Sequence, residues 1–197
     1  MIQLDSKNRD LEQAQAFLKG FGKTAERSVT RVANRVAAGV RTDAVREVRK
    51  EYSVKSTTVR GSFRIKKAGN NVLQAAAISS GPRLGLIHFG ARPGKPNGRR
   101  TPVSVQITKS RKVVENAFVA RMPSGHVGVF ERSGKKGRNN NPSLERIREL
   151  HTLAVPTMAS NKDVEEQIRQ NAYERFSKNL RHEIDYALDN LNLKKGR

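Results

Sequence analysis

Residues 117–132 read AFVARMPSGHVGVFER, and this stretch carries the clearest structural signal in the chain. Apolar and polar side chains alternate on both sides of Pro123, Ser124 and Gly125, which supply the chemistry of a tight turn. The stretch therefore predicts a β-hairpin with arms at 117–121 and 127–132. Shorter alternating segments, separated by Gly, Pro and Asn, predict further strands at 62–66, 72–78, 85–89 and 103–107.

On both sides of this region the apolar spacing lengthens from two residues to three or four. Residues 10–51 follow that period, with Gly20 and Gly22 separating a short first stretch from a long second one. Residues 160–193 place an apolar side chain at every fourth position from Val164 onward, and Ser160 and Asp163 are spaced like a capping box. The sequence predicts a broken N-terminal helix and an amphipathic C-terminal helix.

These elements predict an α+β fold, in which the long N-terminal helix and the C-terminal amphipathic helix pack on a central, mainly antiparallel β-sheet. A single domain is expected over residues 1–197, with a β-rich basic core at 60–132. Segments 92–102 and 133–142 are rich in Gly, Pro, Asn and bases, and both are expected to be loops. The chain is only 36% hydrophobic and 5% aromatic, which suggests that apolar surface is buried against other subunits.

Positive charge is concentrated in the middle of the chain. Residues 52–114 contain no acid, and residues 52–144 hold eighteen Lys and Arg against Glu115 and Glu131, which accounts for most of the net +21. Such an imbalance points to a polyanionic neighbour. The bases on the two expected loops are candidates for contact with DNA or a partner protein: Arg92, Lys95, Arg99, Arg100, Lys135, Lys136 and Arg138. A solvated or subunit-pairing basic face is an equally weighted alternative.

Several other chemistries are disfavoured. The stretch GFGKT at 20–24 resembles the end of a phosphate-binding loop, but Phe17 stands where that motif needs glycine, so a helix kink is expected instead. The chain has no Cys, and its four His are far apart in sequence, so neither a metal site nor a cofactor is expected. His88 is expected in a core or interface strand and His126 at an exposed turn. The sequence contains neither a nucleophile motif nor a pair of carboxylates of the kind that catalysis uses, so an enzyme is not expected.

The N-terminal segment MIQLDSKNRD lacks the apolar stretch of a signal peptide, and no run of about 18 apolar residues occurs. The sequence is therefore expected to be soluble and made in the cytoplasm, without membrane contact. The few aromatics in the basic block alternate on expected strands, so base stacking and sequence-specific recognition are disfavoured.

Three stretches in order resemble the phage and prophage minor tail protein Z family. They are LIHFGAR at 86–92, the hairpin at 117–132, and IREL at 147–150 followed by Val155, Pro156 and Met158. The resemblance implies a virion structural protein without catalytic activity, which completes the head-proximal end of the tail or joins it to the neck. It also implies a homo-oligomeric ring, commonly a hexamer, around the DNA channel, in contact with neighbouring tail and neck proteins and with possible non-specific contact to genomic DNA. A soluble nucleic-acid-binding protein of ribosomal or chromatin type is the alternative, because the composition suits both.

Overall fold

The computed structural model describes residues 9–69, 72, 74–96, 102–136 and 145–195. The chain divides into two compact units, each assembled from stretches that are distant in sequence. Unit 1 comprises residues 1–47, 60–80 and 160–197, and unit 2 comprises residues 48–59 and 81–159. The expected α+β class, with a long helix toward each end and antiparallel strands between them, is confirmed. The expectation of a single domain stays a prediction.

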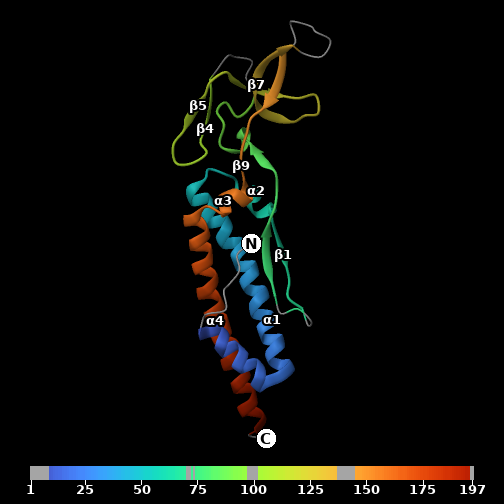
Figure 1. Ribbon diagram of the computed structural model, residues 1–197, viewed down its shortest axis with the longest axis vertical. Helices are drawn as coiled ribbons and strands as arrows, with labels where there is room; N and C mark the ends of the chain where they lie inside the picture. Colours follow the sequence, from blue (N-terminus) through green and yellow to red (C-terminus); the bar gives the residue numbers. More distant parts are fainter. Residues whose placement is uncertain (1–8, 70–71, 73, 97–101, 137–144, 196–197) are drawn as a thin grey trace. The chain divides into compact units, whose positions relative to one another are not determined.

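The first helix of unit 1 is broken where the sequence places its glycines. Helix α1 (Arg9–Glu51) contains one non-helical residue, Gly22, with φ 53° and ψ −135°. A positive φ is costly for a residue with a Cβ atom, so glycine permits the sharp change of direction seen in the dark blue part of the ribbon in Figure 1. The predicted helix kink at this position is confirmed.

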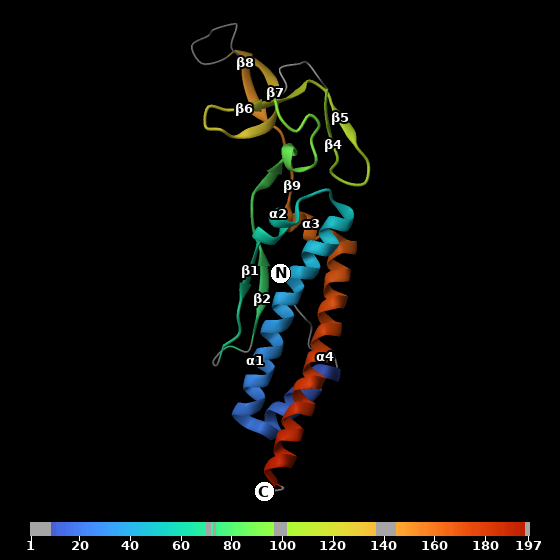
Figure 2. The same ribbon diagram turned by 180° about the vertical axis from the view of Figure 1, so that it is seen from behind.

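Helix α1 and the last helix, α4 (Lys162–Lys195), run antiparallel beside each other (Figures 1 and 2). Ala25 near the start of α1 packs against Ala187 near the end of α4. The predicted four-residue apolar stripes are buried on both helices: Val32, Val36, Val40 and Ala44 on α1, and Val164, Ile168, Ala172 and Leu180 on α4. Tertiary burial of these stripes, more than intrinsic helix propensity, is what stabilises such long helices.

The cap of α4 differs from the prediction. The side-chain Oδ1 of Asn161 accepts a hydrogen bond from the backbone N–H of Asp163 at 3.1 Å, so Asn161 is the capping residue. Ser160 lies one residue before this position and is not the cap. The expected capping box at Ser160 and Asp163 is therefore wrong by one residue, because the segment after α3 (Val155–Ala159) continues as a turn through Ser160.

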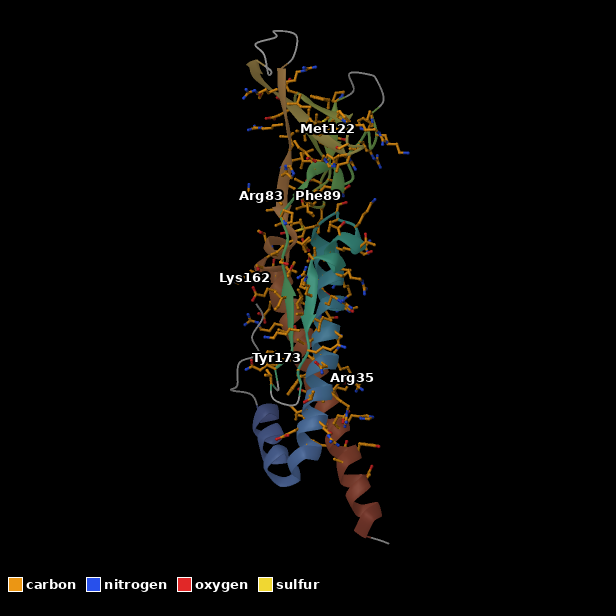
Figure 3. The ribbon with its side chains drawn as sticks, turned by 90° about the vertical axis from the view of Figure 1, so that its right-hand side faces the viewer. Arg35, Arg83, Phe89, Met122, Lys162 and Tyr173 are labelled. Atoms are coloured by element: carbon orange, nitrogen blue, oxygen red, sulfur yellow. The ribbon has the colours of Figure 1, made fainter. Side chains whose placement is uncertain are left out.

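Buried carboxylates join the two long helices. Asp43 on α1 is 1% exposed and accepts hydrogen bonds from Nη1 and Nη2 of Arg175 on α4, at 2.7 and 3.3 Å. Glu183 on α4 accepts from Arg31 on α1 at 2.5 Å. The hydrogen bond from Arg31 lowers the pKa of Glu183, despite partial burial that acts in the opposite direction. Glu47 on α1 is also buried, whereas Arg35, labelled in Figure 3, is exposed.

A two-stranded ribbon lies beside α1 in unit 1 (Figures 1 and 2). It pairs β1 (Phe63–Lys66) with β2 (Ala76–Ser79) in antiparallel register. The side chain of Asn34 on α1 fixes the ribbon by accepting from the N–H of Ala68 at 2.8 Å and donating to its carbonyl at 3.2 Å. The first strand matches the prediction, whereas the second begins later than expected, because Val72 forms only an isolated bridge with Gly69.

Unit 2 contains the remaining described strands, arranged in three small antiparallel sheets. The pairs are β3 (Arg83–Gly85) with β9 (His151–Ala154), β4 (Val103–Val105) with β5 (Lys112–Val114), and β7 (Val127–Lys136) with both β6 (Ala117–Arg121) and β8 (Glu145–Glu149). The short helix α2 (Ser56–Gly61) precedes β1 in sequence. In place of one central sheet, the described strands of both units therefore form four small ones.

The hairpin that opened the sequence analysis is confirmed. Strands β6 and β7 pair with Val119 opposite Val129, and the turn is closed by N–H donation from Met122 to His126 at 2.7 Å. Gly125 has a φ of 84°, a conformation that favours glycine. Val129 is fully buried and joins the core of unit 2, together with Leu86, Ala91, Val103 and Val105.

Two expectations for unit 2 are corrected. The strand expected over 85–89 ends at Gly85, and Leu86–His88 forms a 3-10 turn (η1), which buries Leu86 and Phe89 three residues apart and leaves His88 exposed. Of the two positions expected for His88, the core position is therefore wrong, and the interface position stays a prediction. The loop expected over 133–142 begins too early, because β7 continues to Lys136 with Gly134 at φ 67°. A glycine that was interpreted as a loop residue lies at an irregularity of a strand pair.

Candidate interaction surface

The segment that carries Arg92 and Lys95 is anchored on strand β4. The N–H of Arg92 donates to the carbonyl of Ser104 at 2.8 Å, and the N–H of Ser104 donates back to Arg92 at 2.9 Å. Just before it, Phe89 is fully buried, and its carbonyl accepts from the N–H of Gln106 at 2.9 Å. The backbone is thus held against the core of unit 2, while the side chains of Arg92 and Lys95 are exposed.

Arg111 holds this anchored segment from the side. Its Nη1 donates to the carbonyl of Gly90 at 2.9 Å and to both oxygens of Ser104, at 3.1 Å for the carbonyl and 3.3 Å for the hydroxyl. Ser104 is also the backbone partner of Arg92, so Arg111 braces the base of the Arg92 segment. In the sequence, Arg111 is only one of the eighteen bases of residues 52–144. A structural role could not be found from composition, because it depends on two carbonyls brought together by the fold.

The structure describes the side chains of only two of the seven predicted contact residues, Arg92 and Lys95. Lys135 and Lys136 end β7, with Lys136 in register with Glu145, but their side chains are outside the described part. Arg99, Arg100 and Arg138 lie outside the described residues. No described contact joins any two of the seven, so their gathering into one surface stays a prediction.

Several other bases of unit 2 are engaged by the fold. The guanidinium carbon of Arg132 lies 5.6 Å from the centre of the Phe118 ring, a cation–π geometry. Arg148 forms an ion pair with Glu131 across the register of β7 and β8. Lys109 lies 3.5 Å from the carboxylate of Glu51. These bases contribute to internal contacts, so they are weaker candidates for binding a partner.

A second group of bases in unit 2 is exposed and forms no ion pair within the described part of the chain. Besides Arg92 and Lys95, it includes Arg83, Lys112, Arg121 and Arg146. Of these four, only Arg121 lies on a strand that alternation in the sequence predicts, because β3, β5 and β8, which carry the other three, lack that signal. Because unit 2 supplies few acids to offset them, the unit presents a positive surface that is broader than the two loops.

One carboxylate in unit 2 lies between two histidines. Oε1 of Glu149 is 2.9 Å from Nε2 of His126, and Oε2 is 3.8 Å from Nε2 of His151. Side-chain atoms of Glu149 would lie 2.8 and 2.7 Å from a Cβ placed on Gly85 and Gly128, so these two glycines make room for it. The contact links the exposed hairpin turn to β8, and the exposed position expected for His126 agrees with the structure.

This arrangement has the character of a structural contact. Within the described residues, no group of three or more His, Cys, Asp or Glu side chains is placed to hold a metal ion. The ring of Phe130 packs edge-on against His126, with the centroids 6.4 Å apart. Among the helices that the structure describes, none is both long and apolar enough to cross a membrane.

The comparisons with known proteins give one match. A family model described as prophage minor tail protein Z (GPZ) matches residues 9–194, which is nearly the whole chain and includes both units. Searches of curated proteins and of solved structures gave no significant match. The family match includes the stretches at 86–92, 117–132 and 147–158 on which the resemblance in the sequence rested.

Proposed function

Because the chain belongs to the prophage minor tail protein Z family, we propose that it completes the head-proximal end of a phage tail or the head–tail neck, as a ring of identical subunits around the DNA channel. Family membership supports a structural role in the phage tail and hence a place in the virion. The position at the neck, the ring and the lack of catalysis are parts of the proposal.

The observation that carries the proposal is the match over residues 9–194. It is supported by a basic surface whose exposed groups are not of the kind that read a nucleic-acid sequence. In unit 2 the exposed bases extend from strands and from an anchored segment, and Phe89 and Phe130 are buried where they cannot stack on bases. Such a surface neutralises phosphates or acidic partners without reading sequence. A ring would multiply this charge by the number of its subunits around the channel.

A ring would give each subunit neighbours against which it can bury apolar surface. A cyclic assembly repeats one heterologous interface, and a chain with few aromatics can bury further apolar surface in that interface. Exposed apolar side chains such as Val113, which is 63% exposed, and Val72, which is 52% exposed, are available for it. Native mass spectrometry of the purified protein, alone and with the other tail proteins, is expected to show a closed oligomer in at least one of the two samples.

The assembly role is tested by deleting the coding sequence from the phage or prophage that carries it. We expect DNA-filled heads and separate tails in negative-stain electron microscopy, with joined particles restored when the wild-type chain is supplied in trans. Normal joined particles from the deletion would overturn the proposal. Mass spectrometry of purified virions is expected to detect the chain, and its absence from finished particles would contradict a place in the neck.

The contact role of the basic segment is tested by replacing Arg92 and Lys95 with glutamine. We expect fewer joined particles, because the two side chains are exposed on a fixed backbone. The matched control replaces Lys178 and Arg181, two exposed bases on α4, which removes the same charge. The same loss in both variants would show that only net charge matters.

A soluble nucleic-acid-binding protein of ribosomal or chromatin type, the alternative favoured by the net charge of +21, would be a monomer with tight nucleic-acid affinity.

A further inference from the structure

A second group of bases lies in unit 1, on and beside strand β1 of the β1–β2 ribbon: Arg64 and Lys66 are on the strand, Lys67 directly follows it, and Arg60 is in the last turn of α2. Arg60, Arg64, Lys66 and Lys67 are all exposed, and residues 60–80 contain no aspartate or glutamate. We call these four side chains the ribbon bases. Four positive charges within eight residues repel one another unless an external anion offsets them.

The strand geometry keeps acids away from the ribbon bases. Phe63 is buried and Ile65 half-buried on the inner face of β1, so alternation turns Arg64 and Lys66 outward. Across the ribbon, Arg64 pairs with Ile78 and Lys66 with Ala76. Neither neighbour can neutralise a base. Outward residues two positions apart on a strand recur at about 6.6 Å, so Arg64 and Lys66 project side by side from the same face of β1.

Several other bases of unit 1 do form ion pairs, and all of these pairs lie within the helices α1 and α4. Arg31 binds Glu183, Arg175 binds Asp43, Arg46 binds Asp43 and Glu47, and Arg169 binds Glu165. The ribbon bases form no ion pair within the described residues, although α1 and α4 supply many carboxylates to the same unit. No internal contact therefore accounts for their charge.

The ribbon is also held in place, which lowers the cost of binding. Asn34 clamps Ala68 with two hydrogen bonds at one end of β1, and at the other end the N–H of Ser80 donates to the carbonyl of Ser62 at 2.9 Å. Arg64 and Lys66 are thus presented on an ordered strand rather than on a loop. Preorganisation of this kind removes part of the ordering cost that binding otherwise carries.

We propose that the ribbon bases bind the phosphate backbone of duplex DNA without reading its sequence. A two-stranded ribbon is narrow enough to enter or lie along a major groove, and exposed Arg and Lys side chains bind phosphate oxygens. The outer face offers no aromatic ring for stacking, because Phe63 is 8% exposed. Ile78 on β2 is a large apolar side chain of this face and is 43% exposed. The inference does not depend on the ring or on the loop bases of unit 2.

The test measures binding of the purified chain to a mixed-sequence duplex of about 30 base pairs, by fluorescence anisotropy over a range of salt concentrations. The variant replaces all four ribbon bases with glutamine. The matched control replaces Arg27, Lys162, Lys178 and Arg181, which are exposed bases of the same unit and remove the same charge. Each lost phosphate contact lowers the steepness of log Kobs against log salt by about 0.9, so we expect a decrease of about 3 to 4 for the ribbon variant and less than about 1 for the control.

A second variant tests the outer face of the β1–β2 ribbon without removing any base. Ile78→Glu places an acid opposite Arg64 and is expected to weaken DNA binding at least tenfold, whereas Val113→Glu on β5 of unit 2 is expected to change it less than threefold. Far-UV circular dichroism melting checks that both variants fold. This binding assay needs neither virions nor oligomers, so its failure is distinguishable from failure of the assembly proposal.

Three results would overturn the inference. One is absence of salt-dependent duplex binding by the wild-type chain. Another is an equal decrease in the slope of log Kobs against log salt for the ribbon variant and its control, which would show that binding depends on net charge and not on the ribbon bases. The third is a ribbon variant that keeps DNA affinity but loses binding to poly-glutamate, which would assign the surface to an acidic protein.

Discussion

Replacing Gly39 with alanine is expected to disconnect the two long helices of unit 1 at their buried ion pair. A Cβ on Gly39 would lie 1.7 Å from Nη1, 2.5 Å from Cζ and 2.7 Å from Cδ of Arg175. Real Cβ atoms do not make contacts this short, so we expect the guanidinium to be displaced from its position beside Asp43. Asp43, only 1% exposed, then loses its hydrogen bonds from Arg175 and keeps the contact with Arg46, whose side chain is 55% exposed.

The size of the effect follows from two opposing contributions. Removing one partner of a buried ion pair costs about 3 to 5 kcal/mol. The lower end applies here, because Arg175 is 31% exposed and Arg46 still reaches Asp43. Alanine is a better helix former than glycine and returns about 1 kcal/mol. We therefore expect Gly39→Ala to lower the free energy of unfolding by about 2 kcal/mol, measured by urea denaturation followed by circular dichroism.

A double-mutant cycle isolates the cause. In an Arg175→Ala background the space above Gly39 is vacated, so Gly39→Ala is expected to stabilise the chain by up to about 1 kcal/mol, through helix propensity alone. The change in sign between the two backgrounds is the decisive result. Gly61→Ala serves as the steric control, because nothing lies within 4 Å of a Cβ built there. An equal loss from Gly39→Ala in both backgrounds would refute the role of Arg175.

Three further perturbations have defined outcomes. Arg31 lowers the pKa of Glu183 in the folded state. The stabilisation from this carboxylate is therefore complete above its unfolded pKa of about 4.3 and is lost as the pH falls through the lower folded pKa. Glu183→Gln is expected to make the free energy of unfolding less dependent on pH over this acid range. Asn161→Ala is expected to cost about 1 kcal/mol in thermal or urea unfolding by removing the cap of α4, whereas Ser160→Ala should cost less than about 0.5 kcal/mol. Arg111→Ala is expected to increase amide hydrogen exchange across residues 90–104, with little change in the rate at the β6–β7 turn.

The elements that could be predicted from sequence are those determined by local chemistry. The kink at Gly22 and the turn at Gly125 each require a backbone conformation that glycine favours, and the sequence places them correctly. The apolar stripes of α1 and α4 repeat often enough to determine which face is buried. The hairpin combines both signals, since its turn and its alternating arms agree, which explains why it was the most secure of the strand predictions.

The features missed by sequence analysis depend on residues that are distant in the chain. Strand β8 carries exposed Arg146, Ile147 and Arg148, so it lacks the apolar alternation of a half-buried strand, and only its pairing with β7 makes it a strand. The hydroxyl of Ser133 donates to the carbonyl of Arg146 at 2.9 Å, which holds β7 in register just before the irregularity at Gly134. Composition alone describes that segment as a loop.

Charge is where sequence and structure differ most in what they can decide. By sequence, Arg175 and Arg64 are equal contributions to a net charge of +21. By structure, Arg175 spans a glycine to reach a buried carboxylate, whereas Arg64 stands opposite Ile78 with no acid in the ribbon. Neutralising the first should therefore reduce stability and leave the salt dependence of DNA binding almost unchanged, and neutralising the second should do the reverse. A basic chain becomes informative about function once the bases that stabilise its fold are separated from those that do not.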